Sequence, residues 1–370
     1  IRGLLNKNLF NSNKIGKYMN DLMKRNIASF CVNGELEEII EREDYPIKDC
    51  RNNLFNKTIG VLGYGPQALS QSLNLKDNGF NVNIGVREGN SFLKAQQDGW
   101  IKDKNLFSIE EAVEKSDIIM YLLSDVGQIE QWDKVKYGLT EGKTLYFSHG
   151  FGIVYSDQTS IIPPENVDIV LVAPKGAGIS VREKFLSEQG INASYAIHQD
   201  YTGKAEQTCM SLAFGIGCGH VFKTTFEHEV YSDLVGERSV LMGLIQGAFS
   251  AQYKVLRDKG HSPSEAYNET VEEALVSLYP LINNKGMDWL YKNCSTTAQR
   301  GALDWAPKYE KAIRPVIEEC YESVINGIET ENVIKQNSDV NYRVNLNHEL
   351  NCMSETELWK VGRQLRKFRV

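Results

Sequence analysis

The segment Gly60-Val-Leu-Gly63-Tyr-Gly65-Pro-Gln-Ala68 decides the fold of the first half of this 370-residue chain. It begins within a short apolar run at 56–62 and leads into a polar stretch with helical spacing. In such a G-x-G-x-x-A pattern, the first glycine permits a tight turn and the second lets the backbone approach a pyrophosphate. The small third residue lets the helix pack on the strand, and the helix N-terminus faces the anion. The pattern predicts a dinucleotide site; a glycine-rich turn without a ligand is the alternative.

Further apolar runs of strand length follow along the chain. They lie at 81–86, 117–123, 144–148 and 167–173, with helical stretches between them. Short strands that alternate with helices indicate a parallel sheet covered by helices on both faces. Residues 31–224 are therefore predicted to form an α/β domain of the Rossmann type.

The pattern changes at about residue 225. Apolar residues then recur at three- and four-residue spacing, as in 239–257 and 263–280, without β-branched runs of strand length. This spacing is typical of amphipathic helices. Residues 225–370 are predicted to form a second, all-α domain.

Composition excludes several classes of protein. The formal net charge is −7, so the chain lacks the basic balance of a nucleic-acid-binding protein. No apolar run approaches the roughly 20 residues that a membrane span requires. The seven cysteines are scattered and form no C-x-x-C pair, which indicates free thiols and not a disulfide framework or a zinc site.

The first 30 residues differ from the rest of the chain. Against one acid, Asp21, they carry six basic residues: Arg2, Lys7, Lys14, Lys17, Lys24 and Arg25. A basic, acid-poor and weakly amphipathic segment resembles an organellar transit peptide. A surface helix or an unstructured arm is the alternative.

The residues after the second predicted strand bear on the choice of nucleotide. A site for NAD usually ends this strand with an acid that binds the ribose 2′-hydroxyl. Here the strand continues into Arg87-Glu88-Gly-Asn-Ser91. The guanidinium of Arg87 suits a 2′-phosphate, with Ser91 as a second donor, so we predict NADPH. Glu88 could instead bind a ribose hydroxyl, which keeps NADH as the alternative.

Two pairs of carboxylates lie four residues apart, Asp233/Glu237 and Glu269/Glu273. On a helix, residues at this spacing share one face. Hard cations such as Mg²⁺ take oxygen ligands, so four inward-facing carboxylates could form a metal site. In a chain with 48 acids, most such pairs lie on solvated faces, and spacing alone does not decide between the two possibilities.

Several longer motifs are similar to those of a known family. They are Gly-Tyr-Gly-Pro-Gln at 63–67, Leu-Leu-Ser-Asp at 122–125, Phe-Ser-His-Gly at 147–150, Val-Ala-Pro-Lys-Gly at 172–176, Gly-Ile-Asn-Ala-Ser-Tyr-Ala at 190–196, Ser-Asp-Leu-Val-Gly-Glu-Arg at 232–238, Gly-His-Ser-Pro-Ser-Glu-Ala-Tyr-Asn-Glu-Thr-Val-Glu-Glu at 260–273 and Asn-Cys-Ser-Thr-Thr-Ala at 293–298. From about residue 33 onward, the chain resembles ketol-acid reductoisomerase, also called acetohydroxyacid isomeroreductase. Its single helical repeat resembles the short forms of fungal mitochondria and some bacteria.

The resemblance implies a metal site shared between chains. The helical domain would be knotted, and two chains would interlock in a homodimer or a higher homo-oligomer. Two Mg²⁺ ions would bind each site, with Asp233 bridging both and Glu237 holding one. Glu269 and Glu273 would serve the second position from the partner chain.

It also implies roles for residues in loops. His149 would be the active-site histidine, Lys175 would lie beside the metals, and Ser295 would contact the substrate. Glu273, or a metal-bound water near Lys175, could relay a proton. Without the resemblance, a hydrogen-bonded structural histidine, a solvated lysine and a helix-capping serine would explain His149, Lys175 and Ser295.

The cofactor site that the resemblance and the glycine pattern imply together has ten residues. They are Gly63, Tyr64, Gly65, Gln67, Ala68, Arg87, Ser91, Ser124, Asp125 and Gln128. Pro66 departs from the serine or alanine common in the family and removes an N–H group that could meet a phosphate.

The family activity implied is a two-step reaction on 2-acetolactate or 2-aceto-2-hydroxybutyrate. Mg²⁺-dependent alkyl migration would precede reduction by NADPH, giving a 2,3-dihydroxy-3-methyl acid on the route to valine, leucine and isoleucine. If residues 1–30 are a transit peptide, the expected location is the mitochondrial matrix. If they are not, the expected location is the cytoplasm. The rival functions are a metal-independent hydroxyacid dehydrogenase and a non-enzymatic nucleotide- or DNA-binding module; we expect neither a nucleic-acid nor a membrane partner.

Overall fold

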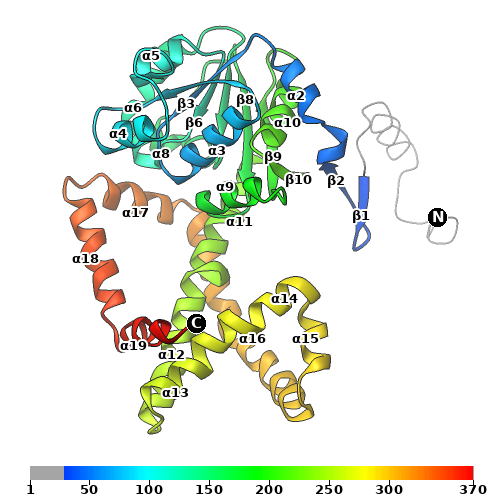
Figure 1. Cartoon of the computed structure of the whole chain (residues 1–370), viewed down its shortest axis with the longest axis vertical. Coiled ribbons are helices and arrows are strands. Elements are labelled where there is room, and N and C mark those ends of the chain that lie inside the picture. Colours follow the sequence, from blue (N-terminus) through cyan, green and yellow to red (C-terminus); the bar gives the residue numbers. More distant parts are fainter. Residues whose placement is uncertain (1–28, 370) are drawn as a thin grey trace, which may run out of the picture. The chain divides into compact units, whose positions relative to one another are not determined.

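The computed structural model describes residues 29–369, and it divides into two compact units that meet between Val230 and Tyr231. This boundary falls inside helix α11 (Phe226–Gly236), whereas the sequence pattern placed it between 224 and 225. The predicted transit segment lies almost wholly outside the described residues. Figure 1 shows the elements of each unit.

The first unit is built on one sheet, whose described strands run in the order β1-β2-β10-β9-β8-β7-β6-β3-β4-β5. Within the run of six strands from β8 to β5, each neighbouring pair is parallel. The bounds are β1 Ser29–Val32, β2 Glu35–Glu41, β3 Thr58–Leu62, β4 Asn81–Gly85, β5 Leu106–Phe107, β6 Ile118–Tyr121, β7 Thr144–Phe147, β8 Asp168–Pro174, β9 Ile191–Gln199 and β10 Cys218–Lys223.

All five predicted strands are confirmed as β3, β4, β6, β7 and β8. The predicted parallel sheet is confirmed in the run from β8 to β5, and the sheet continues beyond it with β9, which runs antiparallel to β8, and β2, which runs antiparallel to β10. Parallel strands buried on both faces read as continuous apolar runs, which the sequence shows clearly. The strands at the antiparallel edge mix polar and apolar residues, so their signal is weaker.

Helices cover both faces of this sheet (Figure 1). Along β6, Ile118 and Met120 join one hydrophobic cluster with residues of α3 and α10, while Ile119 and Tyr121 join the opposite cluster with residues of α5 and α6. This alternation follows from the two-residue period of a strand. The helices of the first unit are η1 Arg42–Asp44, α2 Ile47–Asn53, α3 Pro66–Asp77, α4 Asn90–Gln97, α5 Ile109–Glu114, α6 Asp125–Gly138, α7 Phe151–Val154, α8 Ser156–Thr159, α9 Gly178–Leu186 and α10 Ala205–Gly215.

The elements of the second unit are all helices in the part that the structure describes, as the apolar spacing predicts. After the remainder of α11 come η2 Glu237–Leu241, α12 Gly243–Asp258, α13 Pro263–Tyr267, η3 Asn268–Glu272, η4 Ala274–Leu278, α14 Tyr279–Lys285, α15 Met287–Asn293, α16 Thr296–Ile325, α17 Ile328–Asn337, α18 Tyr342–Ser354, α19 Glu357–Leu365 and η5 Arg366–Phe368. The segments η2, η3 and η4 are π-helical. Such segments are rare and frequently occur at functional sites. Of the predicted carboxylate pairs, Glu237 begins η2, Glu269 lies in η3, and Glu273 follows η3 directly.

The described helices include none that is both long and apolar enough to cross a membrane.

Candidate active site

The glycine loop between β3 and α3 has the geometry of a dinucleotide cradle. Gly63 has a φ of +98°, and a Cβ there would lie 2.9 Å from the carbonyl oxygen of Leu122. A side chain is therefore excluded both by backbone conformation and by space. Gly65 is the N-cap of α3, Pro66 occupies the first turn, and Ala68 is fully buried against the sheet. The loop thus brings a helix N-terminus to the carboxyl end of β3, as an anion site requires.

Gly65 differs from Gly63 in a way that indicates a ligand. Its φ of −75° is open to any residue, and a Cβ at this position would meet no protein atom within 4 Å. The protein itself therefore does not require glycine here. The exposed backbone at Gly65 suits the close approach of a pyrophosphate, so the residues present fit a dinucleotide.

The side chains of Tyr64 and Gln67 hold the glycine loop in place. The Tyr64 hydroxyl donates to Asp98 at 2.9 Å and accepts from the indole of Trp100 at 2.9 Å, and the tyrosine is buried. The Gln67 amide donates to the carbonyl of Gly176 at 3.1 Å. The side chain of Tyr64 is thus engaged within the protein, and a cofactor contact at this residue would involve its backbone.

A second predicted cofactor loop lies where β6 leads into α6. Ser124 caps α6 by accepting from the N–H of Gly127, and Asp125 begins the helix. Gln128 is buried, and its amide donates to the carbonyls of Tyr121 and Leu123. Gln128 therefore fixes the shape of the loop from beneath, and the residues near the open side are Ser124 and Asp125.

The predicted 2′-phosphate residues lie after β4. Arg87 and Glu88 line a cavity of about 260 Å³ together with residues of β5, α5 and α6. The Arg87 guanidinium is largely exposed and approaches the carboxylate of Glu130 on α6 at 3.4 Å. Ser91 is exposed in the first turn of α4. The arrangement places one guanidinium at the end of β4, where the ribose of a dinucleotide lies in folds of this type.

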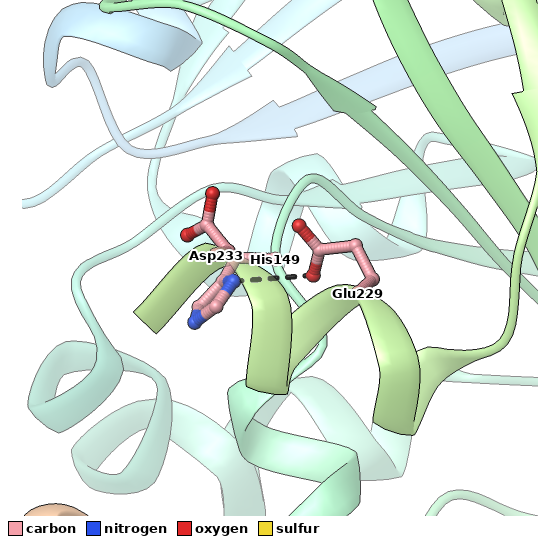
Figure 2. A group of neighbouring side chains, drawn as sticks. All are labelled: His149, Glu229 and Asp233. Atoms are coloured by element: carbon pink, nitrogen blue, oxygen red, sulfur yellow. Dashed lines mark hydrogen bonds and ion pairs between the residues drawn. The ribbon is translucent and has the colours of Figure 1, made fainter. Parts of the chain in front are cut away.

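The carboxyl ends of the neighbouring parallel strands β7 and β8 bring His149 and Lys175 to one carboxylate, Glu229 of α11. Nδ1 of His149 lies 3.2 Å from Oε2 of Glu229, and Nζ of Lys175 donates to Oε1 at 3.2 Å. The N–H of Gly150 also donates to Oε2. Figure 2 shows the imidazole directed at Glu229.

Glu229 is almost completely buried, with 1% of its side chain exposed. Burial opposes its ionisation, but the hydrogen bond and attraction from His149, the charge of Lys175 and the N–H of Gly150 outweigh that effect. The pKa of Glu229 is therefore held below its ordinary value. A buried carboxylate held in this way orients both basic groups.

Asp233 lies one helical turn after Glu229 on α11. One ligand atom each from His149, Glu229 and Asp233 lie within 4.8 Å of one another, and no other such cluster of at least three residues occurs in the described part of the chain. Figure 2 shows both carboxylates rising from the same helix. The oxygens of Glu229 accept from His149, Lys175 and Gly150, and Asp233 adds a second carboxylate beside them.

The remaining predicted metal residues lie outside this cluster. Glu237 is exposed at the start of η2, and its carboxylate is 3.9 Å from the guanidinium of Arg238. Glu269 and Glu273 are exposed at and just after η3. A single chain therefore unites one of the four predicted carboxylates with His149, while the roles of the other three stay predictions.

Comparison with known proteins agrees with this architecture. The family model described as "Acetohydroxy acid isomeroreductase, NADPH-binding domain" matches residues 53–221, and "Ketol-acid reductoisomerase, C-terminal domain" matches residues 226–370. The chain belongs to the ketol-acid reductoisomerase family.

Relatives of this family extend over almost the whole chain. "Ketol-acid reductoisomerase (NAD(+))" of Desulfosudis oleivorans is 54% identical over 91% of this chain and 96% of its own length. The mitochondrial ketol-acid reductoisomerase of Saccharomyces cerevisiae is 51% identical over 93% of this chain and 88% of its own. The structure of an NADH-preferring ketol-acid reductoisomerase from an uncultured archean covers 90% of this chain and 99% of its own, with 31% identity and a TM-score of 0.79.

The serine that the family resemblance assigns to the substrate is a helix cap in this structure. Ser295 precedes α16, and its hydroxyl oxygen accepts from the N–H of Ala298 at 3.2 Å. Capping uses the oxygen as acceptor, so the hydroxyl proton can still be donated. The capping role considered for the sequence is thus present and is compatible with contact to a substrate carboxylate.

Glu229 is the site residue that sequence reasoning missed. It has no carboxylate partner four residues away except Asp233, which was already assigned to the pair with Glu237. The available signal was the stripe Glu229, Asp233, Glu237 on one helical face. Only the fold shows that its first member is buried between His149 and Lys175.

The contrast between the two loop glycines yields a prediction. Gly65→Ala should keep the thermal stability of the chain while weakening NAD(P)H binding roughly tenfold to a hundredfold, because the methyl group would occupy the space of the pyrophosphate. Gly63→Ala, the control, should destabilise the fold by more than about 1 kcal/mol. Differential scanning fluorimetry and cofactor titration would measure both; unchanged cofactor affinity in Gly65→Ala would contradict the cradle.

A second prediction concerns Glu229. Glu229→Gln keeps the size of the side chain but removes the charge that orients His149 and Lys175. We expect kcat to fall roughly a hundredfold while the KM for NAD(P)H changes little. Glu227→Gln, on an exposed position of the same helix, is the matched control. Equal kcat values for the two variants in steady-state assays would show that Glu229 has no role in positioning.

Proposed function

We propose that this chain catalyses the Mg²⁺-dependent conversion of 2-acetolactate and 2-aceto-2-hydroxybutyrate to 2,3-dihydroxy-3-methyl acids, with NADPH as hydride donor. The reaction would serve valine, leucine and isoleucine biosynthesis. The observation that carries the proposal is the cluster of His149, Lys175, Glu229 and Asp233 beside the carboxyl ends of β7 and β8. Ligands of open α/β sheets bind beyond the carboxyl ends of the strands, so this cluster lies where a bound substrate would meet a nicotinamide.

The donor set at Asp233, Glu237, Glu269 and Glu273 fits Mg²⁺, because all four offer only oxygen ligands. Asp233 and Glu237 would hold metal from one chain, and Glu269 and Glu273 from its partner. When bound, the ions would lower the pKa of the substrate hydroxyl, polarise its ketone and stabilise the developing alkoxide.

The chain's own residues have distinct tasks around the substrate. The ammonium of Lys175 and the imidazole of His149 stay oriented by Glu229, and both can exchange protons with substrate oxygens or water. The Ser295 hydroxyl would donate to the substrate carboxylate while it caps α16. Glu273 would relay the proton that leaves the tertiary hydroxyl.

Arg87 supports the choice of NADPH. It is a guanidinium at the end of β4, in the cavity that also contains Lys102 and Lys134. A guanidinium is suited to a phosphate because its donors form a planar fork. The names of relatives mention both nucleotides, with NAD(+) at 54% identity and NADP(+) at 37% identity in the Pyrococcus abyssi enzyme.

The surface of the second unit supports a homodimer or higher homo-oligomer. In the long helix α16 (Thr296–Ile325), the one fully buried residue is Val324, while large apolar side chains are exposed. Exposed apolar residues on this helix are Leu303, Trp305, Tyr309, Val316, Tyr321 and Ile325. Extensive apolar exposure is typical of surfaces that a partner covers. A second copy of the chain would bury this helix and complete each metal site.

The mitochondrial matrix is the proposed location. Three fungal relatives at 50–51% identity bear the word mitochondrial in their names, and the basic segment 1–30 has the composition of a transit peptide. Cell fractionation with an antibody against the chain would test this proposal.

The decisive assay is NADPH oxidation with 2-acetolactate, with and without Mg²⁺. We expect turnover that chelation abolishes, and Asp233→Asn should lose it as well, because a neutral amide is a poor ligand for a hard cation. Glu227→Gln serves as the charge-matched control on α11. Turnover of a hydroxyacid that persists without Mg²⁺ would favour a metal-independent dehydrogenase instead.

A mixing experiment tests whether two chains share each site. Asp233→Asn and Glu269→Gln should each be inactive alone. Co-expressed, they should regain activity, because one of the two sites in a mixed dimer would then receive Asp233 and Glu269 from intact sequences. Continued inactivity of mixed dimers, isolated with two different affinity tags, would show that both carboxylates come from the same chain.

A further inference from the structure

The cavity at the end of β4 contains basic side chains that are already engaged with carboxylates. The guanidinium of Arg87 lies 3.4 Å from the carboxylate of Glu130, and the ammonium of Lys134 lies 2.7 Å from that of Glu110. Arg87 and Lys134 line the cavity together with Glu88, and Glu130 adjoins it on α6. Both carboxylate partners come from helices α5 and α6, outside the loop that follows β4.

We propose that Glu130 is a positioning residue that sets the discrimination between the two nicotinamide cofactors, by holding Arg87 in competition with a ribose 2′-phosphate. This inference rests on the proposed use of NADPH. It adds that Glu130 makes the preference for NADPH over NADH smaller than Arg87 alone would give.

The competition follows from the charges of the two cofactors. A phosphate monoester carries about −1.5 to −2 charges near neutral pH, so the 2′-phosphate of NADPH must take Arg87 away from Glu130 and also meets repulsion from that carboxylate. The ribose 2′-hydroxyl of NADH is neutral and leaves the Arg87–Glu130 pair intact. Glu130 therefore weakens the binding of one cofactor and leaves the other unaffected.

The neighbouring ion pair of Lys134 and Glu110 limits how far another cation of the cavity can replace Arg87 in binding a phosphate. Lys134 follows Glu130 by one turn of α6, but its ammonium is already neutralised by Glu110. The hydrogen bond from Lys134 holds the pKa of Glu110 below its ordinary value, so this partner remains ionised at neutral pH. Of these two cations that are paired with carboxylates, Arg87 has the longer contact, 3.4 Å against 2.7 Å for Lys134, so a phosphate would draw Arg87 from its partner more readily.

The exposure of the pair sets the size of the effect. The side chains of Arg87 and Glu130 are 66% and 53% exposed, so solvent screens their attraction. Exposed ion pairs of this kind shift equilibria by factors of roughly two to five. Glu130 should therefore adjust the cofactor preference and not reverse it.

The test is a calorimetric titration of the full-length protein with NADPH and with NADH, which does not depend on turnover. Glu130→Gln should lower the Kd for NADPH roughly two- to fivefold and leave the Kd for NADH unchanged. Asp133→Asn, which removes the same charge from an exposed position of the same helix, is the matched control and should change both values little. Low ionic strength should enlarge the difference between the two variants.

The double variant separates the inference from the function on which it rests. Arg87→Gln should weaken NADPH binding, and adding Glu130→Gln to it should have no further effect if Glu130 acts through Arg87. A weaker NADPH complex in Arg87→Gln, with Glu130→Gln no different from Asp133→Asn, would overturn the role of Glu130 and leave the NADPH site intact. Unchanged NADPH binding in Arg87→Gln would overturn both.

Discussion

A carboxylate buried in a protein has to be paired, and this constraint organises the region around Glu229. Its two oxygens accept from Lys175, His149 and the N–H of Gly150, and the side chain is almost wholly removed from water. If one of these partners were removed, the negative charge of Glu229 would stay buried without full compensation, which would destabilise the fold. The three partners follow two neighbouring strands, so the ionic contacts bind α11 to the carboxyl edge of the sheet.

The sheet order makes that arrangement possible. The strands β7 and β8 are parallel neighbours, and the residues that follow them therefore emerge side by side. His149 and Lys175 are 26 positions apart in the sequence, yet each contacts a different oxygen of the Glu229 carboxylate. Asp233 extends the same helical face by one turn and adds a second acidic group to the cluster. The geometry unites an imidazole, an ammonium and two carboxylates in one small region.

The nucleotide-binding part of the fold shows two different uses of local chemistry. The glycine loop leaves space at Gly65 that no protein atom fills, which suits the close approach of a phosphate. Beside the cavity after β4, the guanidinium of Arg87 is instead paired with the carboxylate of Glu130. Backbone geometry thus serves the pyrophosphate shared by both cofactors, while the balance of side-chain charge bears on the group at the ribose that distinguishes them.

The sequence alone determined the order of the central strands and helices, the glycine loop, the helical second half and the family. These features depend on local periodicity and on contiguous motifs, which are read directly along the chain. It did not reveal the antiparallel edge strands, whose apolar signal is weak, or the burial of Glu229 and the inward orientation of Tyr64 and Gln128. Tertiary structure decided these, because burial and hydrogen-bond partners depend on segments far apart in sequence. The pairing of Arg87 with Glu130 has the same origin: 43 positions separate the two residues, and the tertiary structure, in which α5 packs against both β4 and α6, brings their charges together.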